Sequence, residues 1–245
     1  CEPFQARDQY LQARCPETLV RTYAMHWPNY QRETARSIRR TPFYHRLREQ
    51  GACFTETQGW ERPGWYAPEG ITPQYNYSFG RQNWFEYALD EQRAARERVA
   101  IVDYSMLGKI SVEGVGAEAF LQRVCTNNMA MACGRIAYTL LLNERGGIES
   151  DVTVARYADD HFMVMSSIAR TRRDYLWLAA LIEPEEQVKL RDETASLGVL
   201  GVMGPQSRAL MTAVTDLDVT NEAFPFNRFY ECHIGHARVT AQRLS

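Results

Sequence analysis

Residues 136–156 read IAYTLLLNERGGIESDVTVAR, and this stretch carries the clearest structural signal in the chain. Two runs rich in apolar and β-branched residues, 136–143 and 148–156, flank the tetrapeptide Glu-Arg-Gly-Gly at 144–147. Glycine readily adopts the positive φ angles that a tight turn requires. The pattern therefore predicts a β-hairpin.

The second run alternates from Asp151 onward, so Val152 and Val154 share one face while Asp151 and Thr153 share the other. Hairpin geometry lets Tyr138, on the first run, approach Asp151 across the ladder. An ionised carboxylate beside an aromatic ring suits a flat heterocycle that carries N–H groups. An aspartate beside a turn and a tyrosine in a strand are also common structural residues. The residue types alone leave both interpretations open.

Outward from the hairpin, short strands and helices follow one another without strict β-α-β alternation, which indicates an α+β fold with mainly antiparallel sheets. Helices are expected at 84–99, 117–124 and 169–182, and strands at 107–112, 162–165, 187–192, 197–202 and 237–244. Residues 1–85 differ, because they are rich in proline and hold Trp27, Trp60, Trp65 and Trp84. They are expected to be irregular, apart from short helices within 2–19 and at 44–50, with aromatic coil at 59–66.

Composition excludes several classes of protein. The 245 residues carry a formal net charge of −2, so no global field attracts nucleic acid or an anionic membrane. The longest apolar run, 176–182, is far shorter than the ~20 residues of a membrane helix. No Gly-x-Gly-x-x-Gly, phosphate-loop or Gly-x-Ser-x-Gly motif is present. The cysteines lack metal-site spacing, so no metal is expected and free thiols are predicted at Cys1, Cys15, Cys53, Cys125, Cys133 and Cys232.

Several segments carry a resemblance to known families. Residues 87–245 resemble the folate-binding domain of the glycine-cleavage T-protein (aminomethyltransferase) family, through 120–128, 134–138, 142–151 and 200–205. Upstream, 25–28, 54–66 and 80–85 resemble the linker that joins the flavin and folate domains of dimethylglycine and sarcosine dehydrogenases.

The resemblance implies a domain plan and a set of site residues. Residues 1–85 would be a linker domain that packs on a missing FAD-dependent oxidoreductase domain, and 86–245 a T-protein-like folate-binding domain truncated at its C-terminus. Asp151 matches the family's essential aspartate, which contacts the folate nitrogens. Tyr138 and Met106 match residues of the folate pocket, and Ser167 stands where many T-proteins have asparagine.

The resemblance also implies an activity. FAD, in the absent domain, would oxidise an N-methyl amine to an iminium, and tetrahydrofolate would take the one-carbon unit and become 5,10-methylenetetrahydrofolate, with Asp151 as the catalytic residue. The expected partners are folate, the amine and the flavin domain, with no nucleic acid and no membrane. The location would be the mitochondrial matrix in a eukaryote or the cytoplasm in a bacterium, and this piece alone is expected to be inactive.

Two alternatives remain open. The parent protein could be a sarcosine oxidase-like or other flavin-linked demethylase with the same folate module. It could also be a non-catalytic regulatory or folate-binding interaction protein of the same domain family, such as a pyruvate dehydrogenase phosphatase regulatory subunit.

Overall fold

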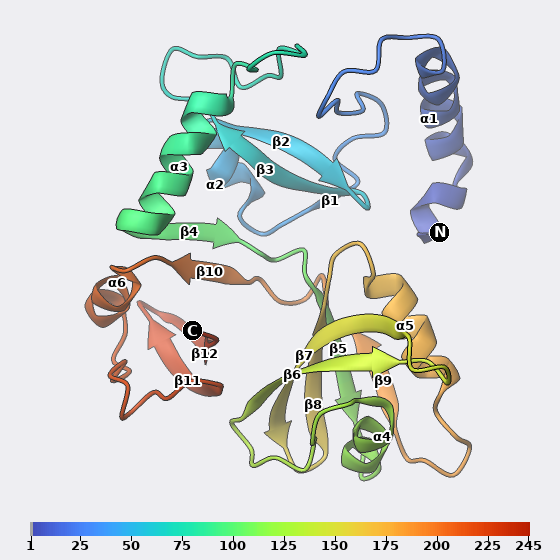
Figure 1. The fold of residues 1–245 in the computed structure, drawn as a ribbon, viewed down its shortest axis with the longest axis vertical. Helices are drawn as coiled ribbons and strands as arrows, with labels where there is room; N and C mark the ends of the chain where they lie inside the picture. Colours follow the sequence, from blue (N-terminus) through green and yellow to red (C-terminus); the bar gives the residue numbers. More distant parts are fainter. Residues whose placement is uncertain (1) are drawn as a thin grey trace. The chain divides into compact units, whose positions relative to one another are not determined.

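The computed structural model describes residues 2–245, which form two compact units (Figure 1). Unit 1 runs to Met106 and includes 198–205; unit 2 comprises 107–197 and 206–245. Cys1, one of the six predicted free thiols, lies outside the described residues. The predicted α+β class is confirmed, because helices accompany sheets in which every described strand pair except β1–β3 is antiparallel.

Unit 1 contains a three-stranded sheet of order β1-β3-β2 and a two-stranded sheet of β4 and β10. Its strands are β1 (Arg39–Arg40), β2 (Ala52–Thr57), β3 (Trp60–Tyr66), β4 (Ala100–Asp103) and β10 (Leu200–Met203). Its helices are a 3-10 turn (Pro3–Ala6), α1 (Asp8–Arg21), α2 (Tyr44–Glu49) and α3 (Phe85–Glu97). The chain thus leaves unit 1 after β4 and returns to it to form β10.

The aromatic stretch 59–66, expected as coil, is instead part of the β2–β3 hairpin. Pro63 lies opposite Phe54, next to a register shift, and β1 pairs with β3 only at Trp60 and Glu61. Pro63 therefore lies on an open edge beside a bulge, where a missing N–H is tolerated. Trp65 is fully buried and stacks on Tyr87 of α3 with ring centroids 5.6 Å apart. The ring of Trp65 is thus covered from within this unit.

Unit 2 is built on a five-stranded antiparallel sheet of order β6-β7-β8-β5-β9. Its strands are β5 (Gly108–Glu113), β6 (Ile136–Leu142), β7 (Ile148–Ala158), β8 (His161–Ser166), β9 (Lys189–Asp192), β11 (Arg228–Ile234) and β12 (Ala237–Arg243). Its helices are α4 (Ala117–Val124), α5 (Thr171–Ala180) and α6 (Ser207–Val214). The predicted hairpin is β6–β7, and its turn contains Gly146 at φ +76°.

One face of this sheet forms the core with α4 and α5. Val152 and Val154 of β7 are buried there, together with Phe120 and Leu121 of α4 and Leu178 of α5. The buried positions of α4 recur with helical spacing, which gives the helix a single apolar stripe. Burying each such large apolar side chain contributes about 1.5–3 kcal/mol. This core fixes which face of β7 is left for polar residues.

The opposite face of β6 and β7 is covered only at one end. There the β11–β12 hairpin packs Phe229 against Ile136 and Ala155, and the amide of Ile136 donates to the carbonyl of Asn227 (2.9 Å). Two residues further along β6 the cover ends, and Tyr138 is 60% exposed. The sheet therefore presents an open polar surface beside the edge of a packed hairpin.

Candidate functional site

The open end of the β6–β7 hairpin brings together two of the predicted site residues. Leu140 is opposite Asp151 and Tyr138 opposite Thr153, so Tyr138 and Asp151 are diagonal neighbours on one face. The Tyr138 hydroxyl donates a hydrogen bond to the Asp151 carboxylate at 3.2 Å. Asp151 is exposed, whereas Val152 and Val154 are buried, as the alternation predicts.

Tyr138 lines a hollow of about 350 Å³. Its walls also include the guanidinium-bearing Arg135 and three asparagines, Asn127, Asn128 and Asn227. Asp151 is not among the lining residues and reaches the hollow only through the Tyr138 hydroxyl. The hollow has the size of a small-molecule site and mixes an aromatic ring with amide and cationic donors.

Asn127 is a residue of this site that sequence reasoning did not assign. Its side-chain amide donates to the Tyr138 carbonyl (3.0 Å), and its backbone amide donates to the Thr139 hydroxyl (3.0 Å). These bonds tie the segment after α4 to β6 beside the tyrosine. An Asn-Asn pair that begins three residues beyond the end of an amphipathic helix is the local signal that could have marked it.

Electrostatics at the pair favour a protonated phenol. Desolvation, then the hydrogen bond and negative charge of Asp151, raise the pKa of Tyr138 above its ordinary value. The hydroxyl therefore remains a donor to the carboxylate over the whole neutral range. Only this one hydrogen bond to the Asp151 side chain is present among residues 2–245, so most of its lone pairs face outward.

The other two predicted site residues lie elsewhere. Ser167 is exposed in the turn between β8 and α5, where its carbonyl accepts from the amides of Arg170 (2.9 Å) and Thr171 (3.0 Å). Met106 is 5% exposed and belongs to unit 1, just after β4. Within the described part of the chain, neither forms a hydrogen bond with Tyr138 or Asp151.

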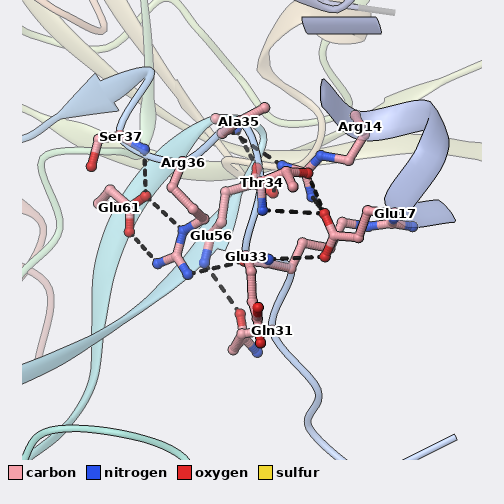
Figure 2. Close-up of polar contacts among 12 residues, drawn as sticks. Arg14, Glu17, Gln31, Glu33, Thr34, Ala35, Arg36, Ser37, Glu56 and Glu61 are labelled. Carbon is pink, nitrogen blue, oxygen red and sulfur yellow. Dashed lines mark hydrogen bonds and ion pairs between the residues drawn. The ribbon is translucent and has the colours of Figure 1, made fainter. Parts of the chain in front are cut away.

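Unit 1 holds a second polar cluster, which Figure 2 shows. Glu61 of β3 accepts from Nε of Arg36 (2.8 Å), from a second Arg36 nitrogen and from the amide of Ser37 (2.7 Å). Glu17 of α1 accepts from the amides of Glu33 (2.9 Å) and Thr34 (3.2 Å). The carboxylates in this cluster fasten the irregular segment around 30–37 to a helix and a sheet.

Two kinds of site are not found in residues 2–245. No helix there has the length and apolar character to cross a lipid bilayer. Likewise, no group of three or more histidine, cysteine or acidic side chains within that range is arranged to hold a metal ion.

Comparison with known protein families shows to which family this chain belongs. The chain belongs to the GCVT N-terminal domain family, whose model matches residues 43–245. Residues 2–41 match the FAD dependent oxidoreductase central domain. The chain therefore combines a GCVT N-terminal domain with a segment that matches the FAD dependent oxidoreductase central domain, and these are the two families that the sequence resembles.

Similar proteins refine this placement. 4-Methylaminobutanoate oxidase (formaldehyde-forming) of Paenarthrobacter nicotinovorans is 40% identical over 235 residues, which cover 95% of this chain and 28% of the relative. Human mitochondrial sarcosine dehydrogenase is 29% identical over 275 residues, covering 97% and 30%. The chain thus spans less than a third of the length of these relatives.

A solved structure supports the fold. The crystal structure of glycine cleavage system aminomethyltransferase T from Bartonella henselae superimposes with a TM-score of 0.61 and 23% identity, covering 80% of this chain and 48% of that one. At this identity the likeness concerns the fold alone.

Proposed function

We propose that this chain is the folate-binding, one-carbon-transfer part of an FAD-dependent enzyme that oxidises N-methyl amines. The observation that carries the proposal is the Tyr138–Asp151 pair at the edge of the 350 Å³ hollow, in a domain of the GCVT family. When bound, tetrahydrofolate supplies nucleophilic nitrogens for a one-carbon unit, and the expected product is 5,10-methylenetetrahydrofolate.

The residues at the hollow fit such a ligand. A reduced folate combines a flat heterocycle with N–H donors and a tail that ends in carboxylates. Asp151 offers carboxylate oxygens without a further hydrogen bond in the described structure, and Tyr138 offers an exposed ring. Arg135 and the three asparagine amides offer donors for a carboxylate or carbonyl group.

In the proposed mechanism Asp151 acts as a positioned base. Its carboxylate accepts the hydrogen bond of a ligand N–H, orients that nitrogen and takes or relays its proton as the new carbon–nitrogen bond forms. The Tyr138 hydroxyl holds one carboxylate oxygen, so the other remains available to the ligand. Met106 and Ser167 remain predictions from the resemblance, and neither belongs to the lining of the hollow. FAD and the amine would bind in parts of the protein outside this chain.

The test is Asp151→Asn in the natural protein loaded with flavin, using sarcosine, dimethylglycine and 4-methylaminobutanoate as amines. Amine-driven flavin reduction should be unchanged, whereas formation of 5,10-methylenetetrahydrofolate should fall about 100-fold or more. Glu144→Gln, the same change of chemistry at the exposed hairpin tip, is the matched control and should leave both rates unchanged. Transfer at the original rate in the Asp151 variant would refute the proposed role.

A second candidate function follows from the relative that is 40% identical, since its name gives formaldehyde as a product. The domain would then bind folate weakly or not at all, and the one-carbon unit would leave as formaldehyde. Because formaldehyde also condenses with tetrahydrofolate without an enzyme, the fall in free formaldehyde on adding tetrahydrofolate is compared between the natural protein and its Asp151→Asn variant. An equal fall in both would favour the second function.

A further inference from the structure

A buried carboxylate on the inner side of the sheet is not used by the proposed mechanism. Asp174 of α5 is 2% exposed, and its Oδ2 accepts hydrogen bonds from the hydroxyls of Ser150 on β7 (2.8 Å) and Ser166 on β8. Both serines are buried as well. Among residues 2–245 no ion pair to Asp174 is present, so these hydroxyls are the side-chain groups that satisfy it. Burying a carboxylate without hydrogen-bond donors costs folding free energy, so the two serine hydroxyls are needed where they are.

The pairing of β7 is irregular immediately before Ser150. Ser150 is opposite Leu141, but Ile148 is opposite Leu142, so Glu149 bulges out of the ladder. Helix α5 holds the bulge as well. Arg173 donates to the Glu149 carbonyl (2.7 Å), Arg170 donates to the same oxygen, and Arg173 forms an ion pair with the Glu149 carboxylate. Bulges redirect the side chains that follow them.

Ser150 and Asp151 are neighbours that point to opposite faces of the sheet. Whatever fixes the direction of the Ser150 side chain therefore fixes the direction of Asp151. On the outer face the Asp151 carboxylate is held only by the Tyr138 hydroxyl within the described residues. The side chain of the neighbouring Ser150, by contrast, is held by a buried hydrogen bond to Asp174.

We propose that Asp174 is a positioning residue for Asp151: by holding the Ser150 hydroxyl, it sets the twist of β7 after the bulge so that the Asp151 carboxylate meets the Tyr138 hydroxyl. The catalytic consequence of this inference rests on the proposed function. The structural part does not, because it concerns contacts within unit 2 alone.

The two serines provide a matched pair of variants. Ser150→Ala and Ser166→Ala each remove one hydroxyl from the same Asp174 oxygen, but only Ser150 adjoins Asp151. Both variants should lower the thermal unfolding midpoint by similar amounts. Asp174→Asn keeps an oxygen that can accept from both serines and serves as the conservative variant.

The readout is the titration of Tyr138, followed by NMR of the chain labelled with ¹³C in the tyrosine rings and assigned with Tyr138→Phe. Because Asp151 contributes to the raised pKa of Tyr138, Ser150→Ala should lower that pKa toward its ordinary value. Ser166→Ala and Asp174→Asn should leave it unchanged. In the natural protein, Ser150→Ala should also reduce one-carbon transfer roughly 10-fold or more, and Ser166→Ala should not.

Equal Tyr138 titrations in the Ser150→Ala and Ser166→Ala variants, whether both shifted or both unshifted, would overturn the inference. This outcome is independent of the proposed function, since no folate is present. Conversely, a selective shift in Ser150→Ala together with unimpaired transfer in Asp151→Asn would uphold the positioning of Asp151 while refuting its catalytic role.

Discussion

Glu61 in unit 1 and Asp151 in unit 2 are both strand carboxylates, yet their surroundings differ in kind. Glu61 is 2% exposed and receives hydrogen bonds from two Arg36 nitrogens and the Ser37 amide. Asp151 is exposed and receives one, from the Tyr138 hydroxyl. A carboxylate has about four acceptor positions. Glu61 has used most of them inside the protein, whereas Asp151 keeps most of them for a ligand.

The comparison gives a criterion for sorting acidic residues in this fold. The saturated acids, Glu61 and Glu17, fasten an irregular segment in place, so their removal should affect stability. Removal of Asp151, which keeps free acceptor positions, should instead impair the chemistry and leave the stability of the fold almost unchanged. Variants and chemical modification at the buried groups and at the exposed Tyr138–Asp151 pair can test this division.

The largest effect concerns thiols. Burial raises the pKa of Cys125, on the inner side of unit 2, from 9.0 to about 12. Only the thiolate is alkylated. At pH 8 iodoacetamide should therefore modify Cys125 on the order of 1,000-fold more slowly in the folded chain than in denaturant, because burial disfavours the reactive thiolate. Peptide mass spectrometry measures the rates, and the exposed Cys133 serves as the internal control that reacts in both states. Similar rates for Cys125 in the two states would mean that this interior opens readily.

The next effect is on stability. Arg36→Ala leaves the buried Glu61 carboxylate with only the Ser37 amide, and breaking a buried ion pair from one side costs about 3–5 kcal/mol. Urea unfolding followed by tryptophan fluorescence measures the loss. Arg81→Ala removes half of the Arg81–Glu86 pair, whose side chains are 67% and 61% exposed, and should cost at most about 1 kcal/mol. Equal losses of unfolding free energy in the two variants would contradict the distinction between the buried, saturated Glu61 and the exposed Glu86.

The smallest effect is expected at the hairpin pair. Tyr138→Phe removes the one hydrogen bond to Asp151 but buries no unpaired group, so stability should hardly change. One-carbon transfer in the natural protein should fall by roughly 10-fold or less, because the carboxylate remains and only its orientation is loosened. Since the pKa of Tyr138 is raised, the phenol donor persists above its ordinary value of 10.0 and is lost only at still higher pH. A Tyr138→Phe variant with no loss of transfer would restrict the tyrosine to a structural role.

Local pattern was sufficient for much of unit 2. The predicted hairpin, the alternation around Val152 and the helix 117–124 all appear, because turn glycines and apolar periodicity are encoded within a few residues. The diagonal approach of Tyr138 to Asp151 followed from the same register. The domain division at residue 85 stays a prediction.

Features that depend on long-range contacts were not predicted from the sequence. β3 was missed because proline and glycine within 60–66 argue against a strand unless a bulge and an open edge are known. β11 was missed too, although Asn227, the residue just before it, lines the hollow. The contact between Ser150 and Asp174 joins residues 24 apart across a helix and a sheet, and neither residue carries a local sign of the other.

The pairing of β4 with β10 has a consequence for co-translational folding. Ala100–Asp103 can acquire its antiparallel neighbour Leu200–Met203 only after residues 104–199 have been translated. At ~5–20 residues per second this delay is roughly 5–20 s. Meanwhile the five-stranded sheet, whose strands all lie within that interval, has its complete sequence first. The nascent chain should therefore complete the five-stranded sheet before the β4–β10 sheet, although β4 is the first of these strands to be translated.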